Sequence, residues 1–125
     1  MGLDRERDNI GYLLGRVLAI GDCIQSTSIG HGGPNRNFSD SFRGSLGTTP
    51  RMVLKNIDDK INFHLSKIKR NAKGLGISLH KEYSEIFGRI NSVPAVLGMD
   101  DQVEFVLGYQ HQYQSQFTKR SVPNA

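Results

Sequence analysis

The amino-acid sequence predicts an all-α fold, a small antiparallel bundle of about four helices with one long loop rich in glycine and serine. Apolar residues recur at spacings of three and four in four separate segments, which places them on one face of a helix in each segment. The strict alternation typical of a half-buried strand persists nowhere. The 125 residues suffice for one modest core, so residues 1–125 are interpreted as a single domain.

The first helix is predicted from Asn9 to about Gln25, with Asp8 or Asn9 as its N-terminal cap. Two glycines, Gly11 and Gly15, lie four residues apart in it. Each costs about 1 kcal/mol of helix stability relative to alanine, so we expect another backbone to pack closely there and offset that cost. Its apolar face consists of Ile10, Leu13, Leu14, Val17, Gly21 and Ile24.

Residues 26–47 are predicted to form the long loop, because Gly, Ser and Asn dominate the segment. A short turn is expected within it at residues 38–42. Loops of this length are usually functional or disordered. This one carries Arg36 and Arg43 beside Phe38 and Phe42, so functional contact and simple mobility both remain open.

The second helix begins after Thr48 or Thr49, because Pro50 suits the first helical turn, where its missing N–H has no partner to lose. It should end near Lys73, since "KGLG" supplies the glycines that commonly follow a helix C-terminus. Its apolar stripe consists of Leu54, Ile57, Ile61, Leu65 and Ile68.

Two further helices are predicted, one over residues 78–91 and one that begins at Asp100 or Asp101. Asp101 and Glu104 have the spacing of a capping box. The glutamines at positions 110, 112, 114 and 116 are interpreted as an uncharged surface for a neighbouring chain or a polyanion. The residues expected to share one face of the last helix are Val103, Val106, Leu107, Tyr109, Tyr113 and Phe117.

Positive charge is concentrated in residues 51–73. The whole chain has a net charge of +4, whereas this segment holds seven basic residues against two acidic ones. Such a cluster is typical of phosphate-backbone binding, although a solvated helix face has the same composition. Helical spacing aligns Lys60 with Lys67 and keeps Arg70 and Lys73 close to the same side. The candidate nucleic-acid-binding residues are Lys60, Lys67, Arg70, Lys73, Lys69, Lys55, Arg51, Arg43 and Arg36.

The sequence contains no enzyme signature that we recognise. "HGGP" at residues 31–34 is similar to an oxyanion loop, but no nucleophile elbow accompanies it. Cys23 is interpreted as a small core residue, and His64 as a packed side chain. We therefore expect no catalysis, no metal and no cofactor. The histidines that lack metal-ligand spacing with one another or with the cysteine are His31, His64, His80 and His111.

We also expect a cytoplasmic protein without membrane contact. No apolar run approaches the roughly 18 residues that a membrane span requires. The first eight residues alternate in charge, unlike a signal peptide. A single cysteine permits no internal disulfide, which suits a reducing compartment.

Three motifs follow one another along the chain: "YLLGRVLAIGDCIQ" at residues 12–25, "FRGSLGTTPRMVL" at 42–54 and "FVLGYQHQ" at 105–112. In this order they resemble the C-terminal helical domain of the large subunit of the type I-C CRISPR complex Cascade. In such systems the same reading frame also yields a separate small subunit from an internal translation start. The chain is similar to that product, and an excised domain would look the same.

The resemblance implies a non-catalytic small subunit of a crRNA-guided surveillance complex. Such subunits bridge the backbone subunits and hold the displaced non-target DNA strand during R-loop formation, while guide pairing supplies sequence specificity. The implied partners are the backbone and large subunits, copies of the chain itself, the crRNA and the target DNA. The alternative is a helical protein–protein adaptor without nucleic-acid contact. A more distant alternative is a hydrolase that uses the loop at His31.

Overall fold

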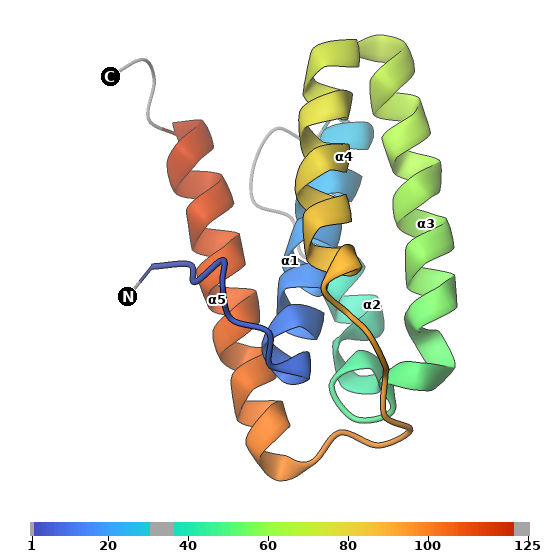
Figure 1. Ribbon diagram of the computed structural model, residues 1–125. Helices are drawn as coiled ribbons and strands as arrows, with labels where there is room; N and C mark the ends of the chain where they lie inside the picture. The colour runs from blue at the N-terminus through green and yellow to red at the C-terminus, as the bar shows by residue number, and fades with distance from the viewer. Residues whose placement is uncertain (1, 31–36, 122–125) are drawn as a thin grey trace.

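A computed structural model describes residues 2–30 and 37–121 of the protein, and only the backbone of residues 37 and 117–121. Within these ranges the chain is all-α, which confirms the predicted fold class, and it contains no strand. Consecutive helices alternate in direction (Figure 1). The described residues form one more helix than the four predicted. The five helices are α1 (Ile10–Ser28), α2 (Asn37–Leu46), α3 (Pro50–Asn71), α4 (Lys73–Gly88) and α5 (Met99–Ser121).

Helix α1 is the central element, with the other four helices packed around it. Every residue from 11 to 24 is buried, because a helix that is surrounded on all sides needs no solvated face. Its N-terminal cap is Asn9, whose side-chain Oδ1 accepts hydrogen bonds from the backbone N–H groups of Gly11 (2.8 Å) and Tyr12 (3.2 Å). The prediction of a cap at this position is therefore confirmed.

The closest helix pair is α1 with α5, and these two helices run parallel (Figure 1). A β-carbon added to Gly11 would overlap the backbone of Asp101, and one added to Gly15 would overlap the backbone of Phe105. From the other side, Gly108 lies against the backbone of Tyr12 in the same way. The expected close backbone approach at Gly11 and Gly15 is confirmed, with α5 as the partner.

The prediction of a continuous loop over residues 26–47 is wrong, because α2 occupies Asn37–Leu46 and α1 extends to Ser28. Helix α2 forms despite its weak helix formers because Phe38 and Leu46 are buried in the core. Its first turn is capped from outside, since the Ser39 backbone N–H donates to Asp22 Oδ1 of α1 at 2.8 Å.

Helix α3 begins at Pro50 as predicted, and the core residues Ile57, Ile61, Leu65 and Ile68 on its stripe are buried. Leu54 is only half-buried. The Thr49 side chain makes no cap hydrogen bond to the helix; its hydroxyl donates to the Ser45 carbonyl instead.

The connection from α3 to α4 differs from the prediction. Helix α3 ends at Asn71, and "KGLG" opens α4 rather than following a helix end. Gly76 permits this tight turn, because a β-carbon there would overlap Lys69. Farther along, the Tyr83 hydroxyl donates to Asp58 and ties the two helices together, and burial followed by this hydrogen bond raises the pKa of Tyr83.

Helix α5 begins at Met99, and the predicted capping box is wrong. Asp101 Oδ1 accepts a hydrogen bond from the Asn9 side chain at 3.1 Å, and Glu104 pairs with Arg7. The predicted apolar face is divided: Val103 and Val106 are 57% and 52% exposed, whereas Tyr109 is buried. The described side chains that α5 buries are those of Phe105, Tyr109, Gln112 and Gln116.

Candidate nucleic-acid interface

One face of α3 presents three cations, Lys60, Lys67 and Arg70. Their spacings of seven and three place them along one side of the helix. Lys60 and Arg70 are exposed, and Lys67 is half-buried. None of the three forms an ion pair with a carboxylate among the described residues. We call these three residues the basic face; their positive charges are available to an anionic ligand.

The basic face is held in place by its neighbours. Lys60 Nζ lies 5.6 Å from the ring centroid of Phe42 in α2, which is a cation–π distance. His64 lies between the two lysines along the helix and is buried, with its Nδ1 2.8 Å from the Ser28 hydroxyl of α1. The prediction that His64 is a packed side chain is therefore confirmed.

Burial lowers the pKa of His64 below its ordinary value, and the positive charges of Lys67 and Lys60 lower it further. The imidazole is therefore neutral at pH 7. Lys60 and Lys67 lie four residues before and three residues after His64 on α3, so their charges act on the same part of the molecule. A partner with negative charge would lie in a locally positive field there.

The structure places other predicted cations in intramolecular contacts away from this face. Lys55 pairs with Asp59 at 3.1 Å, and Arg51 Nε donates to the Val93 carbonyl at 3.0 Å. Lys69 approaches His80 of α4, with 2.5 Å between Nζ and Nδ1. These cations point in different directions around α3, because their spacing along the helix distributes their side chains around its axis.

Lys73 does not continue the basic face, because α3 ends at Asn71 and Lys73 is the first residue of α4. Arg43 is part of α2 rather than a flexible loop, and its guanidinium lies 4.5 Å from the ring centroid of Tyr109. Arg36 lies outside the described residues. Of the four cations predicted to align, the structure thus brings three together.

Sequence reasoning missed Phe63, which lies in the middle of the basic face. It is three residues after Lys60 and four before Lys67, and it is 61% exposed. Its position between the lysines could have been predicted from the same helical spacing that aligned them. Together with Phe42, Asn56, Asp59 and Lys60, it lines a shallow open hollow between α2 and α3.

A second surface feature is an apolar stripe on the outer side of α5. Its members are Met99, Val103, Val106 and Leu107, which recur at helical spacing and are all exposed. Sequence analysis placed the last three on one face of the helix together with Tyr109, which is buried. These three residues point outward because the glycine contacts with α1 turn the opposite side of α5 inward.

The glutamines of α5 divide between the two sides. Gln112 and Gln116 are buried, so their interpretation as surface residues is wrong, whereas Gln110 and Gln114 are exposed. The buried Gln112 side chain has a hydrogen-bond partner there, because its Oε1 accepts from Arg16 Nε at 2.9 Å.

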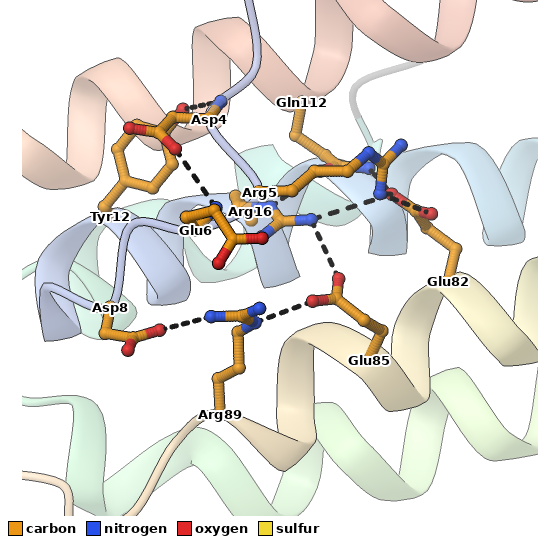
Figure 2. Close-up of polar contacts among 10 residues, drawn as sticks. All are labelled: Asp4, Arg5, Glu6, Asp8, Tyr12, Arg16, Glu82, Glu85, Arg89 and Gln112. Carbon is orange, nitrogen blue, oxygen red and sulfur yellow. Dashed lines mark hydrogen bonds and ion pairs between the residues drawn. The ribbon is translucent and has the colours of Figure 1, made fainter.

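Arg16 is the centre of a polar network that joins α1, α4 and α5 (Figure 2). Its side chain is fully buried, and its Nη2 lies 3.2 Å from Glu85 and 3.7 Å from Glu82. Burial lowers the pKa of Arg16, while the charges of Glu85 and Glu82 oppose that change. The network extends outward through Arg5, which pairs with Glu82, and through Arg89, which joins Glu85 to Asp8.

The same network sets the ionisation of Glu82. Burial raises its pKa, but hydrogen bonds from Gln112 and Arg5, with the charges of Arg5 and Arg16, outweigh burial and leave the pKa lowered. Glu82 is therefore ionised at neutral pH. Because Gln112 belongs to α5 and Glu82 to α4, the network stabilises the positions of both helices against α1.

Cys23 is fully buried in the core, which confirms its interpretation as a core residue. In the ranges that the structure describes, no group of three or more His, Cys, Asp and Glu side chains is arranged to hold a metal ion. Across those same residues, no helix has the length and apolar character needed to cross a membrane.

The fold and surface define a small helical-bundle protein, with a basic face on α3 and an apolar stripe on α5. Comparison with protein families identifies it further: the model of the family described as CRISPR-associated protein (Cas_Csd1) matches residues 1–117. The chain therefore belongs to the Csd1 family of CRISPR-associated proteins. No curated protein matches it significantly.

Proposed function

We propose that the chain is a non-catalytic small subunit of a type I-C crRNA-guided surveillance complex. In this proposal it bridges backbone subunits and holds the displaced non-target DNA strand, which stabilises the R-loop. Family membership supports a role in a CRISPR complex. The observation that carries strand binding is the basic face of α3, where three cations without ion pairs to described residues line one side of a helix.

The chemistry of this role requires only phosphate neutralisation. Lysine and arginine bind the backbone without reading sequence, and guide RNA pairing supplies the specificity. Three phosphate contacts to a single strand give an expected log–log salt slope of about −2, from roughly 0.7 per neutralised phosphate. Different DNA sequences should be bound almost equally.

The apolar stripe on α5 supports contact with protein neighbours. Contiguous exposed aliphatic side chains on a small protein usually mark an interaction site. The stripe lies on α5, whereas the basic face lies on α3, so one chain can contact a protein and a strand together (Figure 1). The same stripe also favours the second candidate, a helical adaptor that binds protein only.

Charge reversal tests the proposal. A variant with Lys60→Glu, Lys67→Glu and Arg70→Glu should fold and assemble, yet protect the non-target strand poorly in the complex. Its control carries Lys55→Glu, Lys73→Glu and Lys81→Glu, three exposed cations outside the basic face, with an identical change in net charge.

Footprinting of the non-target strand at physiological salt, after copurification with guide RNA and backbone subunits, measures the effect. If R-loops form and persist equally with both variants, the basic face is only a solvated surface and the adaptor function is preferred. If the control variant is the weaker one, the strand follows α4 and the N-terminal part of α3 instead.

A further inference from the structure

The basic face of α3 has an aromatic side chain at its centre. Lys60, Phe63 and Lys67 follow one another at spacings of three and four, so they are neighbours along one side of the helix. Phe63 is 61% exposed, because the core-facing residues of α3 lie on the opposite side of the helix. A large apolar ring between cations contributes nothing to the core from this position.

The neighbours of Phe63 hold its ring without covering most of it. The His64 ring lies 5.2 Å away with an interplanar angle of 73°, so the two rings meet edge to face rather than stacked. His64 is itself fixed by its contact with Ser28. Phe63 therefore packs against a buried neighbour on one side and retains aromatic surface for a ligand.

The hollow beside Phe63 combines three kinds of group. Phe42 forms a second aromatic wall and is anchored by Phe38, whose ring centroid is 5.1 Å away. Asn56 supplies an amide that can donate and accept hydrogen bonds. Lys60 supplies a positive charge at the edge, and the one carboxylate of the lining, that of Asp59, is paired with Lys55.

These groups match an unpaired nucleotide. Aromatic faces stack on any base, an amide can bond to a base edge, and lysines on either side neutralise the adjacent phosphates. The charge around Phe63 favours this ligand over an apolar protein segment, since Lys60, Lys67 and Arg70 have no ion pair to a described carboxylate and suit a polyanion.

We propose that Phe63 stacks on an unpaired nucleobase of a single DNA strand whose flanking phosphates contact Lys60 and Lys67. This rests on the proposed function for strand binding and adds a contact that phosphate neutralisation alone does not require. Base–aromatic stacking corresponds to an affinity gain of about 10-fold per base. The contact is tolerant of sequence, because every base has a π-face.

The test compares two oligonucleotides of equal length and charge, one of thymidines and one in which every base is removed. Fluorescence anisotropy at low salt gives the affinity of the 125-residue chain for each. Wild type should prefer the thymidine strand by about 10-fold. The Phe63→Leu variant should lose this preference but keep the wild-type affinity for the abasic strand. The Phe63→Trp variant, which has an aromatic ring at the same position, should show the preference for the thymidine strand.

Met52→Ala is the matched control, because Met52 is an exposed apolar residue on the same helix, about 16 Å from Phe63 along its axis. It should retain the preference for thymidine. Equal binding of the two strands by wild type, with affinity that depends on Lys60 and Lys67, would overturn the stacking contact and leave the proposed function standing.

Two other results would also overturn it. Binding of neither strand would remove the proposed strand binding and the stacking together. A Phe63→Leu protein that binds both strands as wild type does, but no longer joins the complex, would identify Phe63 as a protein contact.

Discussion

Gly15 of α1 lies so close to Phe105 of α5 that a β-carbon on the glycine would overlap the Phe105 carbonyl oxygen. The obstacle is backbone, which cannot rotate aside as a side chain can. This contact is repeated at Gly11 of α1 and, from the other side, at Gly108 of α5. It explains why both helices contain glycines that weaken them as isolated helices.

Gly15→Ala should therefore destabilise the protein. Alanine improves helix propensity by about 1 kcal/mol, but separating two packed backbones typically costs more than that, so we expect a net loss of about 2 kcal/mol in the free energy of unfolding. Urea unfolding measures it. Gly44→Ala is the control: a β-carbon there meets nothing within 4 Å, so stability should stay equal or rise. A Gly15→Ala protein as stable as Gly44→Ala would contradict the close packing.

Ile61→Asp should unfold the protein. Ile61 is fully buried on α3, and an unpaired carboxylate in an apolar core costs several kcal/mol, a large part of the stability of a small domain. Thermal melting followed by circular dichroism is the measurement. Ser66→Asp, at an exposed position on the same helix, should melt close to wild type. An unchanged melting curve for Ile61→Asp would mean that the core is wrongly assigned.

Arg16→Lys should destabilise the protein although charge is retained. The guanidinium of Arg16 reaches Gln112 through Nε and Glu85 through Nη2, and a single ammonium cannot reproduce both contacts. We expect a loss of about 2 kcal/mol. Arg5→Lys serves as the control, because Arg5 is partly exposed and an exposed ion pair contributes at most about 1 kcal/mol. Equal unfolding free energies for the two variants would show that the two hydrogen bonds of the buried Arg16 guanidinium do not contribute to stability.

Stability should fall in acid through Glu82. Its pKa is lowered in the folded state, so its contribution is complete above the ordinary value of 4.5 and is lost as the pH falls through the lower folded value. Glu82→Gln should reduce stability at pH 7 and flatten the acid dependence. Urea unfolding between pH 7 and the acid limit tests this. A Glu82→Gln protein with the wild-type dependence would exclude Glu82 as the source.

Features that depend on local spacing could be predicted from the sequence alone. The helical recurrence of Ile57 and Ile61 identified α3, and the spacing of Lys60, Lys67 and Arg70 identified the basic face, because 3.6 residues per turn sets which side chains share a side. Phe63 belongs to that same pattern and was readable from it.

Features that depend on residues far apart in the chain became visible only in the folded protein. Helix α2 forms where composition predicted a loop, because its first-turn N–H at Ser39 is capped by Asp22 and its Phe38 is buried against Gly21. The inner face of α5 combines Phe105 and Tyr109 with the polar Gln112, because Arg16 is buried and requires an acceptor such as Gln112. A buried charge or an unpaired N–H is stabilised only by whichever partner the fold brings to it.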